Sequence, residues 1–310
     1  MAEGLVPTTP MAFDERTTLM DVHMFGTPHF GGIYLIDEDR PTLIETGTSD
    51  SKAAILRALD QLHVEPATIE NVIVTHIHLD HAGGAGFLLD QLPRARVYVH
   101  ELGFPHLADP SRLLASAAKA LGDAFAGYGT LRPIPEERMV PVRGGEVLDL
   151  GGRELEIVYS PGHARHHVCI LDRSTRALYT GDSSGIYFPV DGRIIPTSPF
   201  PEFDLPTALE TMERLEALRP EALLYSHFGP YEDAGGMLRD QRREYERWGA
   251  KAAKLFGEMD VWRAAETLYE EWFADVTEFS RVFVERIILT NLLGFQRYFE
   301  RTQDDASRSG

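Results

Sequence analysis

The sequence predicts an α+β protein in which a β-sandwich is covered by helices and precedes an all-helical C-terminal segment. Two stretches, 17–99 and 146–225, contain short apolar runs typical of strands, separated by turn residues and helical patterns. Beyond residue 233 strand patterns stop, and large apolar residues recur among helix formers. We therefore expect one domain over residues 1–232, a helical appendage of two to four helices over 233–303, and an unstructured polar tail over 304–310.

The elements of the first stretch follow from apolar runs and from the residues that separate them. Turn residues fall between the first two runs, and Ser49 or Asp50 is suited to cap the helix that follows. The predicted elements are, in order, strands at 31–36 and 42–47, a helix around 54–59, a strand at 72–74, a glycine-rich helix start at 83–86 and a strand at 96–99.

An alanine- and leucine-rich helix over 110–128 connects the two strand-rich stretches. In the second stretch, Gly151-Gly152 and the polar run 172–175 are turns of two predicted hairpins. The predicted elements there are strands at 146–150, 154–158, 168–171 and 177–180, then a helix over 205–218 and a strand at 222–225.

Composition limits the partners and the compartment. The 310 residues carry a formal net charge of −18, which argues against nucleic acid as a partner. The single cysteine, Cys169, excludes an intramolecular disulfide and is typical of a reducing compartment. No signal-like segment and no membrane-spanning apolar stretch is present, so we expect a cytoplasmic protein that does not bind membranes.

A cluster of potential metal ligands follows the strand at 72–74 directly. Within six residues the chain carries His76, His78, Asp80 and His81. Imidazole and carboxylate groups are the ligands that zinc and similar divalent cations prefer. Because unpaired polar groups are costly at the end of a buried strand, this spacing predicts a metal site.

Three further candidates each follow a predicted strand. They are His163 in Pro161-Gly162-His163, Asp182 after Gly181, and His227 after Ser226. Each is unremarkable alone, but strand ends can meet at one edge of a sandwich. Together the seven side chains are enough for two cations that share a carboxylate.

The order His-x-His-x-Asp-His, Pro-Gly-His, Gly-Asp and Ser-His resembles the metallo-β-lactamase-fold hydrolase superfamily over roughly residues 17–229, and within it the glyoxalase II and lactonase-like branch. The resemblance implies a four-layer αββα sandwich with a binuclear site at one edge. It also implies a ligand assignment: His76, His78 and His163 for the first metal, Asp80, His81 and His227 for the second, and Asp182 as the bridge.

The chain departs from the family pattern at Glu45, where an aspartate is common. His167 matches the second histidine of the glyoxalase-II-like motif, and we expect it to support the ligands without coordinating. At position 78 the diiron flavoprotein branch has glutamate, so His78 weakens an oxygen-reducing role.

Two divalent cations, expected to be zinc with iron or manganese as alternatives, would share a hydroxide at neutral pH. Asp80 is the candidate to orient this nucleophile and pass its proton onward. We therefore predict a zinc-dependent hydrolase of a small ester, lactone or thioester.

The alternatives are a small-molecule phosphodiesterase on the same site and a mononuclear iron persulfide dioxygenase that uses His76, His163 and Asp182. A non-catalytic metal scaffold is a third possibility, which the intact ligand set disfavours.

Four aromatic residues are predicted to line a substrate pocket: His29, Phe30, Tyr187 and Phe188. An ordinary loop, or core packing for the last two, is the alternative. Cys169 alternates within an apolar strand and is expected to be buried packing. The large apolar residues of the C-terminal helices predict a homodimer.

Overall fold

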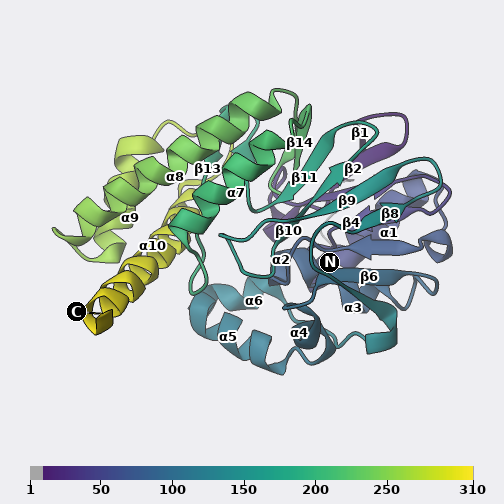
Figure 1. The fold of residues 1–310 in the computed structure, drawn as a ribbon, viewed down its shortest axis with the longest axis horizontal. Coiled ribbons are helices and arrows are strands. Elements are labelled where there is room, and N and C mark those ends of the chain that lie inside the picture. The colour runs from purple at the N-terminus through teal and green to yellow at the C-terminus, as the bar shows by residue number, and fades with distance from the viewer. Residues whose placement is uncertain (1–9, 310) are drawn as a thin grey trace, which may run out of the picture.

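The computed structural model describes residues 10–309, with side chains through residue 304, and contains two packed sheets flanked by helices (Figure 1). The first sheet consists, in spatial order, of β1 (Met11–Ala12), β2 (Thr17–Asp21), β3 (Gly32–Ile36), β4 (Thr42–Ile44), β5 (Asn71–Ile73), β6 (Arg96–His100) and β7 (Met139–Val142). The second consists of β15 (Gly229–Tyr231), β14 (Ala222–Tyr225), β11 (Ala177–Gly181), β10 (Val168–Asp172), β9 (Glu154–Tyr159) and β8 (Val147–Asp149). A separate hairpin pairs β12 (Ile186–Phe188) with β13 (Arg193–Ile195).

Helices connect the strands and form the C-terminal segment. The α-helices are α1 (Lys52–Gln61), α2 (Leu79–Ala82), α3 (Ala85–Leu88), α4 (Phe104–Ala108), α5 (Ser111–Leu121), α6 (Phe125–Tyr128), α7 (Leu205–Ala217), α8 (Ala234–Phe256), α9 (Val261–Trp272) and α10 (Arg281–Ser309). Short 3-10 helices are η1 (Met24–Gly26), η2 (Ser49–Ser51), η3 (Pro66–Thr68), η4 (Gly122–Ala124) and η5 (Glu136–Arg138).

Alternation along the strands explains the layers. In β3, Tyr34 and Ile36 belong to a cluster shared with β9 and β10 of the other sheet, whereas Ile33 and Leu35 pack with the helices. Because successive side chains of a strand point to opposite faces, each central strand is apolar on both faces. The predicted αββα sandwich is confirmed.

Strand pairing brings the ends of distant segments together. β11 and β14 are parallel, and Gly181 pairs with Tyr225, so Asp182 and Ser226-His227 leave the sheet side by side. The two sheets are also joined at this edge, because the Val168 N–H donates to the Thr75 carbonyl at 2.8 Å. The loops that carry the candidate ligands therefore meet at one edge of the sandwich.

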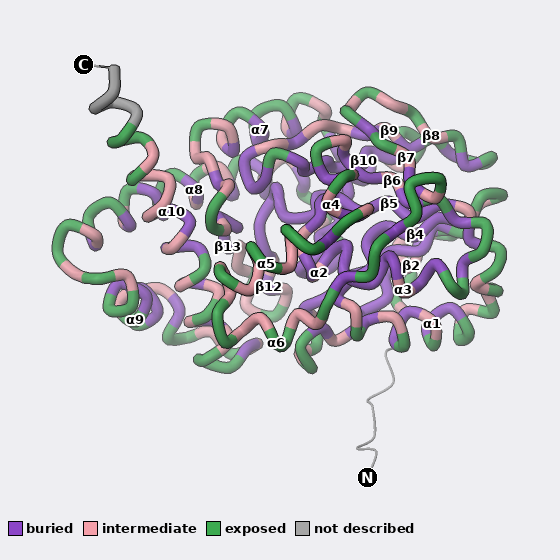
Figure 2. Tube along the Cα trace, turned by 90° about the horizontal axis from the view of Figure 1, so that it is seen from below, coloured by how far each residue is buried: buried purple, intermediate pink, exposed green. Residues whose placement is uncertain are grey.

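The three C-terminal helices continue the core instead of standing apart from it. Their apolar residues, among them Leu268, Leu292 and Phe295, are buried in the same cluster as the helix-facing side of the sheets (Figure 2). Trp262 and Val282 are the large apolar side chains of these helices that are strongly exposed among the described residues, at 65% and 59%. Most of the residues behind the homodimer prediction are thus used within the chain, and the dimer stays a prediction.

The predicted unstructured tail is wrong for residues 304–309, because α10 continues to Ser309. The sequence has no proline or glycine between Phe295 and Ser309 that would end the helix. Among the described residues, no helix combines the length and the apolar content that crossing a membrane requires.

Candidate metal centre

The first four candidate ligands lie where β5 ends and α2 begins. His76 follows the strand, His78 precedes the first residue of α2 in an extended conformation, and Asp80 and His81 lie in the first turn. An extended segment followed at once by a helical turn places His76, His78 and His81 around one point. The ring centroids of His78 and His81 lie 4.4 and 4.0 Å from the ring centroid of His76.

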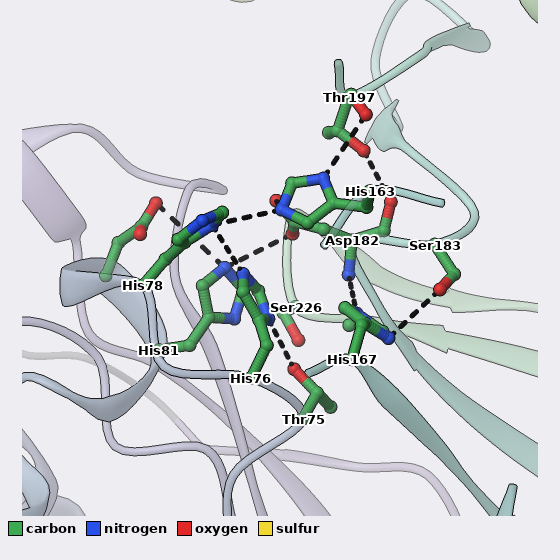
Figure 3. Close-up of polar contacts among 12 residues, drawn as sticks. Thr75, His76, His78, His81, His163, His167, Asp182, Ser183, Thr197 and Ser226 are labelled. Atoms are coloured by element: carbon green, nitrogen blue, oxygen red, sulfur yellow. Dashed lines mark hydrogen bonds and ion pairs between the residues drawn. The ribbon is translucent and has the colours of Figure 1, made fainter. Parts of the chain in front are cut away.

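One half of the site consists of three histidines whose ring nitrogens converge. His78 Nδ1 lies 2.9 Å from His76 Nε2 and 3.0 Å from His163 Nε2 (Figure 3). His163 arrives from the loop after β9, so it joins a cluster from the other sheet. These are the residues predicted to hold the first metal.

The other half contains two histidines and a carboxylate. His227 Nε2 lies 3.2 Å from His81 Nε2 and 3.7 Å from Asp80 Oδ2. The third distance in this group, from His81 Nε2 to Asp80 Oδ2, is 4.0 Å. These three residues are those predicted to hold the second metal.

Asp182 lies between the two halves. Its Oδ1 is 3.2 Å from His81 Nε2 and 3.6 Å from His227 Nε2, and its Oδ2 is 3.5 Å from His163 Nε2. One carboxylate oxygen therefore faces each half, which is the arrangement that a bridging ligand requires. The structure thus brings all seven predicted side chains together.

The hydrogen bonds of the outer ring nitrogens show that this donor set fits cations. His163 Nδ1 must donate to the Thr197 carbonyl at 3.2 Å, and His76 Nδ1 must donate to Thr75 Oγ1, whose own proton is given to Glu45 at 2.5 Å. The Nε2 atoms of both rings therefore carry lone pairs that point toward His78 Nδ1, which can donate a proton to only one of them. Asp182 Oδ1 is likewise buried without a hydrogen bond of good geometry. Buried lone pairs in contact are unfavourable unless a cation lies between them.

A buried carboxylate supports the second half. Glu45, 1% exposed, accepts hydrogen bonds from His81 Nδ1 at 3.0 Å, from Ser226 Oγ at 3.1 Å and from Thr75 Oγ1. Such a partner fixes the ring orientation of a ligating histidine and raises its basicity. The sequence marks Glu45 only as a departure from the family pattern.

His167 supports the bridge without facing the cluster. Its Nε2 accepts the backbone N–H of Asp182 at 3.1 Å, and its Nδ1 contacts the Ser160 and Ser183 hydroxyls at 2.8 and 3.0 Å. With both ring nitrogens occupied, His167 has the supporting position that the sequence suggested, and coordination of a cation by it is not needed.

The two halves differ in electrostatics. Burial lowers the pKa of His76 and of His163, the latter to about 3. Burial also opposes the charge on His81, but the carboxylates of Asp182, Glu45 and Asp80 outweigh it and raise the pKa of His81 well above its ordinary value. Burial favours the neutral form of Asp182, yet the surrounding histidines lower its pKa well below the usual range. In the metal-free chain a proton on His81 therefore takes the place of a cation.

The predicted pocket residues have different positions. Phe30 is 6% exposed and stacks on the ring of His227 at 4.5 Å, so it does border the site. His29 contacts Glu278 at 3.0 Å, which ties the loop to the C-terminal segment. Tyr187 packs against Tyr225 and Tyr231.

The prediction that Phe188 lines a pocket is wrong. Phe188 is fully buried and packs edge-on against Phe279 at 4.6 Å. Alternation in the three-residue strand β12 turns Ile186 and Phe188 inward and leaves Tyr187 partly exposed. Cys169 is also fully buried, as predicted, and burial raises the pKa of its thiol to about 12.

Several residues at the site were not found from the sequence. Phe25 and Phe283 join Phe30 in an aromatic group, and Thr197 contacts His163 and donates to the Asp182 carbonyl. None belongs to a motif, and their contacts depend on how distant segments pack. A weak signal was available for Phe25, because it lies four residues before His29, a predicted pocket residue.

Comparison with known proteins defines the family. Residues 26–227 match the model of the metallo-beta-lactamase superfamily, so the chain belongs to this superfamily, as its motifs predicted. A metallo-beta-lactamase fold-containing protein of Sulfurisphaera tokodaii is 34% identical over 207 residues, which are 65% of this chain and 74% of the relative. The crystal structure of an archaeal superfamily member from Sulfolobus tokodaii has a TM-score of 0.67 and 27% identity, covering 87% of this chain and 94% of the other.

Among the more distant relatives and structural neighbours are proteins with different chemistries. A Homo sapiens acyl-coenzyme A thioesterase is 26% identical over 166 residues, and the match spans 51% of this chain and 56% of that protein. A chemotaxis sensor solved as a peroxy diiron species has a TM-score of 0.55 at 15% identity, with 76% and 94% of the chains covered. At this identity the sensor shares the fold alone. A divalent metal site is thus supported, while the metal is left open.

Proposed function

We propose that this chain is a metal-dependent hydrolase that cleaves a small ester, lactone or thioester. The observation that carries the proposal is the position of Asp182, with one oxygen toward each of two ligand groups. A site in which two ligand groups share one carboxylate suits the attack of water on an electrophilic carbonyl. The similarity to an acyl-coenzyme A thioesterase supports a thioester among the candidate substrates.

Two bound divalent cations, held by the seven side chains described above, would supply a water of lowered pKa and polarise the substrate carbonyl. Asp80 is 15% exposed in its side chain, so one carboxylate oxygen can face the second half while the other reaches incoming water. In this position Asp80 orients the water and accepts its proton. The Oδ2 atom of Asp80 lies 3.7 Å from His227 Nε2 and 4.0 Å from His81 Nε2.

The chain itself holds the reacting groups and limits solvent access. Phe30 covers one face of the His227 ring, so water reaches this ligand from the Asp80 side. Glu45 and His167 keep His81 and Asp182 in fixed orientations through hydrogen bonds. Pre-organised ligands of this kind spare the reaction a reorganisation cost.

Metal analysis and a substrate panel test the proposal. The purified chain is assayed by elemental mass spectrometry and then with an ester, a lactone, a thioester, a phosphodiester and a persulfide. We expect about two divalent cations per chain, and ester or thioester turnover that a chelator removes and added metal restores. Turnover of the phosphodiester alone would support the phosphodiesterase alternative. One iron per chain with oxygen consumption on the persulfide would overturn hydrolysis in favour of the dioxygenase.

A further inference from the structure

The segment between β13 and α7 contacts two of the predicted metal ligands. The Thr197 carbonyl accepts the Nδ1–H of His163 at 3.2 Å, and the Thr197 hydroxyl donates to the Asp182 carbonyl at 2.5 Å (Figure 3). A neutral imidazole that donates from Nδ1 keeps its lone pair on Nε2, which is the nitrogen of His163 that faces the cluster. Thr197 therefore sets the tautomer of one ligand and holds the backbone of another.

Helix α10 anchors this segment through Ser198, the residue after Thr197. The Ser198 N–H donates to Asn291 Oδ1 at 2.6 Å, and the Ser198 hydroxyl lies 2.9 Å from the same oxygen and 3.1 Å from the Asn291 carbonyl. Both residues are buried, so loss of the Asn291 oxygen would leave a buried N–H unpaired. A Cβ on Gly294 would overlap the Ser198 carbonyl oxygen, so this glycine lets the segment lie directly against the backbone of α10.

Helix α8 supplies a second anchor through Tyr245. The hydroxyl of this buried residue lies 3.3 Å from the Thr197 carbonyl, 3.4 Å from the Thr197 hydroxyl and 3.5 Å from the Ser183 carbonyl. Because the Thr197 hydroxyl gives its proton to Asp182, Tyr245 can donate to that oxygen or to either carbonyl. Ser183 follows Asp182 in the sequence. Tyr245 therefore contacts both segments that meet at the bridging residue.

Both anchors lie outside the part of the chain that matches the superfamily model, which ends at residue 227. The hydrogen bonds behind a ligating histidine commonly change metal affinity by about 10–100-fold. Here those hydrogen bonds depend on side chains of the C-terminal helices. Their effect should be larger in the half of the site with three histidines, since His163 belongs to that half alone.

We propose that Asn291 and Tyr245 are positioning residues of the metal centre. They hold the Thr197 carbonyl on His163 Nδ1 and the Thr197 hydroxyl on the Asp182 carbonyl. In this way the C-terminal helices set the affinity of the three-histidine half for its cation. The inference concerns metal binding and does not depend on the proposed hydrolysis.

Two measurements test the proposal. Chelator competition gives the affinities for both cations, and nitrogen-15 signals of the imidazoles in the metal-free chain show which nitrogen of His163 carries the proton. His163→Gln identifies its own signals and the affinity that belongs to its half. In Asn291→Leu we expect this affinity to fall by about 10–100-fold, and the His163 proton to become shared between both nitrogens. Tyr245→Phe removes one hydroxyl with longer contacts and should lower the affinity by about two- to tenfold.

Two control variants separate positioning from a general loss of stability. Asn71 is also buried, and it donates to Thr42 Oγ1 at 3.0 Å at the end of β5 away from the ligands. Asn71→Leu should therefore lower the melting temperature and leave both affinities and the His163 tautomer unchanged. Tyr269→Phe removes a hydroxyl from α9, where the ring contacts Arg281, and should change neither measurement.

An unchanged His163 tautomer together with unchanged affinities in Asn291→Leu and Tyr245→Phe would overturn the proposal. An equal loss of affinity in Asn71→Leu would also overturn it, because the effect would then follow stability alone. If Asn291→Leu does not fold, Tyr245→Phe and its control decide the question. Neither measurement uses turnover, so the result stands whether or not the chain hydrolyses an ester.

Discussion

The two halves of the metal centre are built from similar ligands but differ in their surroundings. His76 and His163 contact neutral groups of Thr75 and Thr197 through Nδ1, and burial lowers the pKa of both and of His78. His81 contacts Glu45 and Asp182, and these carboxylates raise its pKa despite burial. The first half therefore presents neutral histidine nitrogens to a cation. The second half carries negative charge, which a proton or a cation must balance.

Removing the residue shared by both halves should have the largest effect. Asp182→Asn keeps the shape of the side chain but removes the charge that faces both groups. We expect turnover to fall by about 10⁴-fold, as for groups that act as a unit, together with loss of bound metal. Elemental analysis and kcat measurements check this, with Asp60→Asn at the exposed end of α1 as the control. Retention of two metals and full turnover would show that the halves do not share Asp182.

Asp80 belongs to the second half alone. Asp80→Ala should lower kcat by about 10²–10⁴-fold, the range for loss of a general base, while the three histidines of the first half still bind one cation. The measurement is metal stoichiometry together with kcat in the same preparation. If both cations are lost together, the halves are not separable as described.

Glu45 tests the difference between the two halves, because it accepts a hydrogen bond from the outer nitrogen of the ligand His81. Glu45→Gln should weaken metal binding by about 10–100-fold, the usual effect of a partner behind a ligating histidine. The loss should be larger for the cation held by His81, which Glu45 contacts directly, than for the cation held by His76, which Glu45 reaches only through Thr75. Competition with a chelator monitors both affinities, and equal weakening of the two sites would contradict the distinction.

The stability of the metal-free chain should depend on pH with opposite signs at His163 and His81. His163 has a folded pKa of about 3, below its unfolded value of about 6.5, so its stabilising contribution is present above pH 6.5 and is lost as the pH falls. His81 has a raised folded pKa, so its contribution is present below pH 6.5 and is lost as the pH rises through the folded value.

The melting temperature of the metal-free chain between pH 5 and 9 measures this effect. His163→Gln should flatten the decrease toward acid, and His81→Gln should flatten the decrease toward alkali. Identical pH profiles for the two variants would contradict the assigned charges.

The sandwich and the ligand cluster could be predicted because both leave local signals. Strands such as β3 and β10 are short apolar runs between turns, and each ligand follows such a run directly. His76, His78, Asp80 and His81 are also close in sequence, so their proximity needs no knowledge of the fold. The strand order explains why His163, Asp182 and His227 join them. Their convergence was expected because strand ends can meet at one edge and because the resemblance implies a binuclear site there.

The surroundings of the site could not be predicted, since they depend on packing between distant segments. Phe188 and Tyr187 are adjacent, and only the direction of β12 decides which of them is buried. Phe283 belongs to a helix whose sequence does not show which face meets Phe30. Glu45 is buried among ligand partners, although the sequence marked it only as a departure from the family pattern.

The burial of Cys169 makes the chain's single sulfhydryl a natural reporter of global opening. It lies under the helices on the second sheet, where its Sγ contacts the Thr180 carbonyl at 3.4 Å. A thiol dye can reach it only after the sheet and its covering helices separate. Labelling rates at rising urea concentrations would therefore follow the opening of this layer without any engineered probe, and any alkylating reagent that modifies the folded chain must have another target.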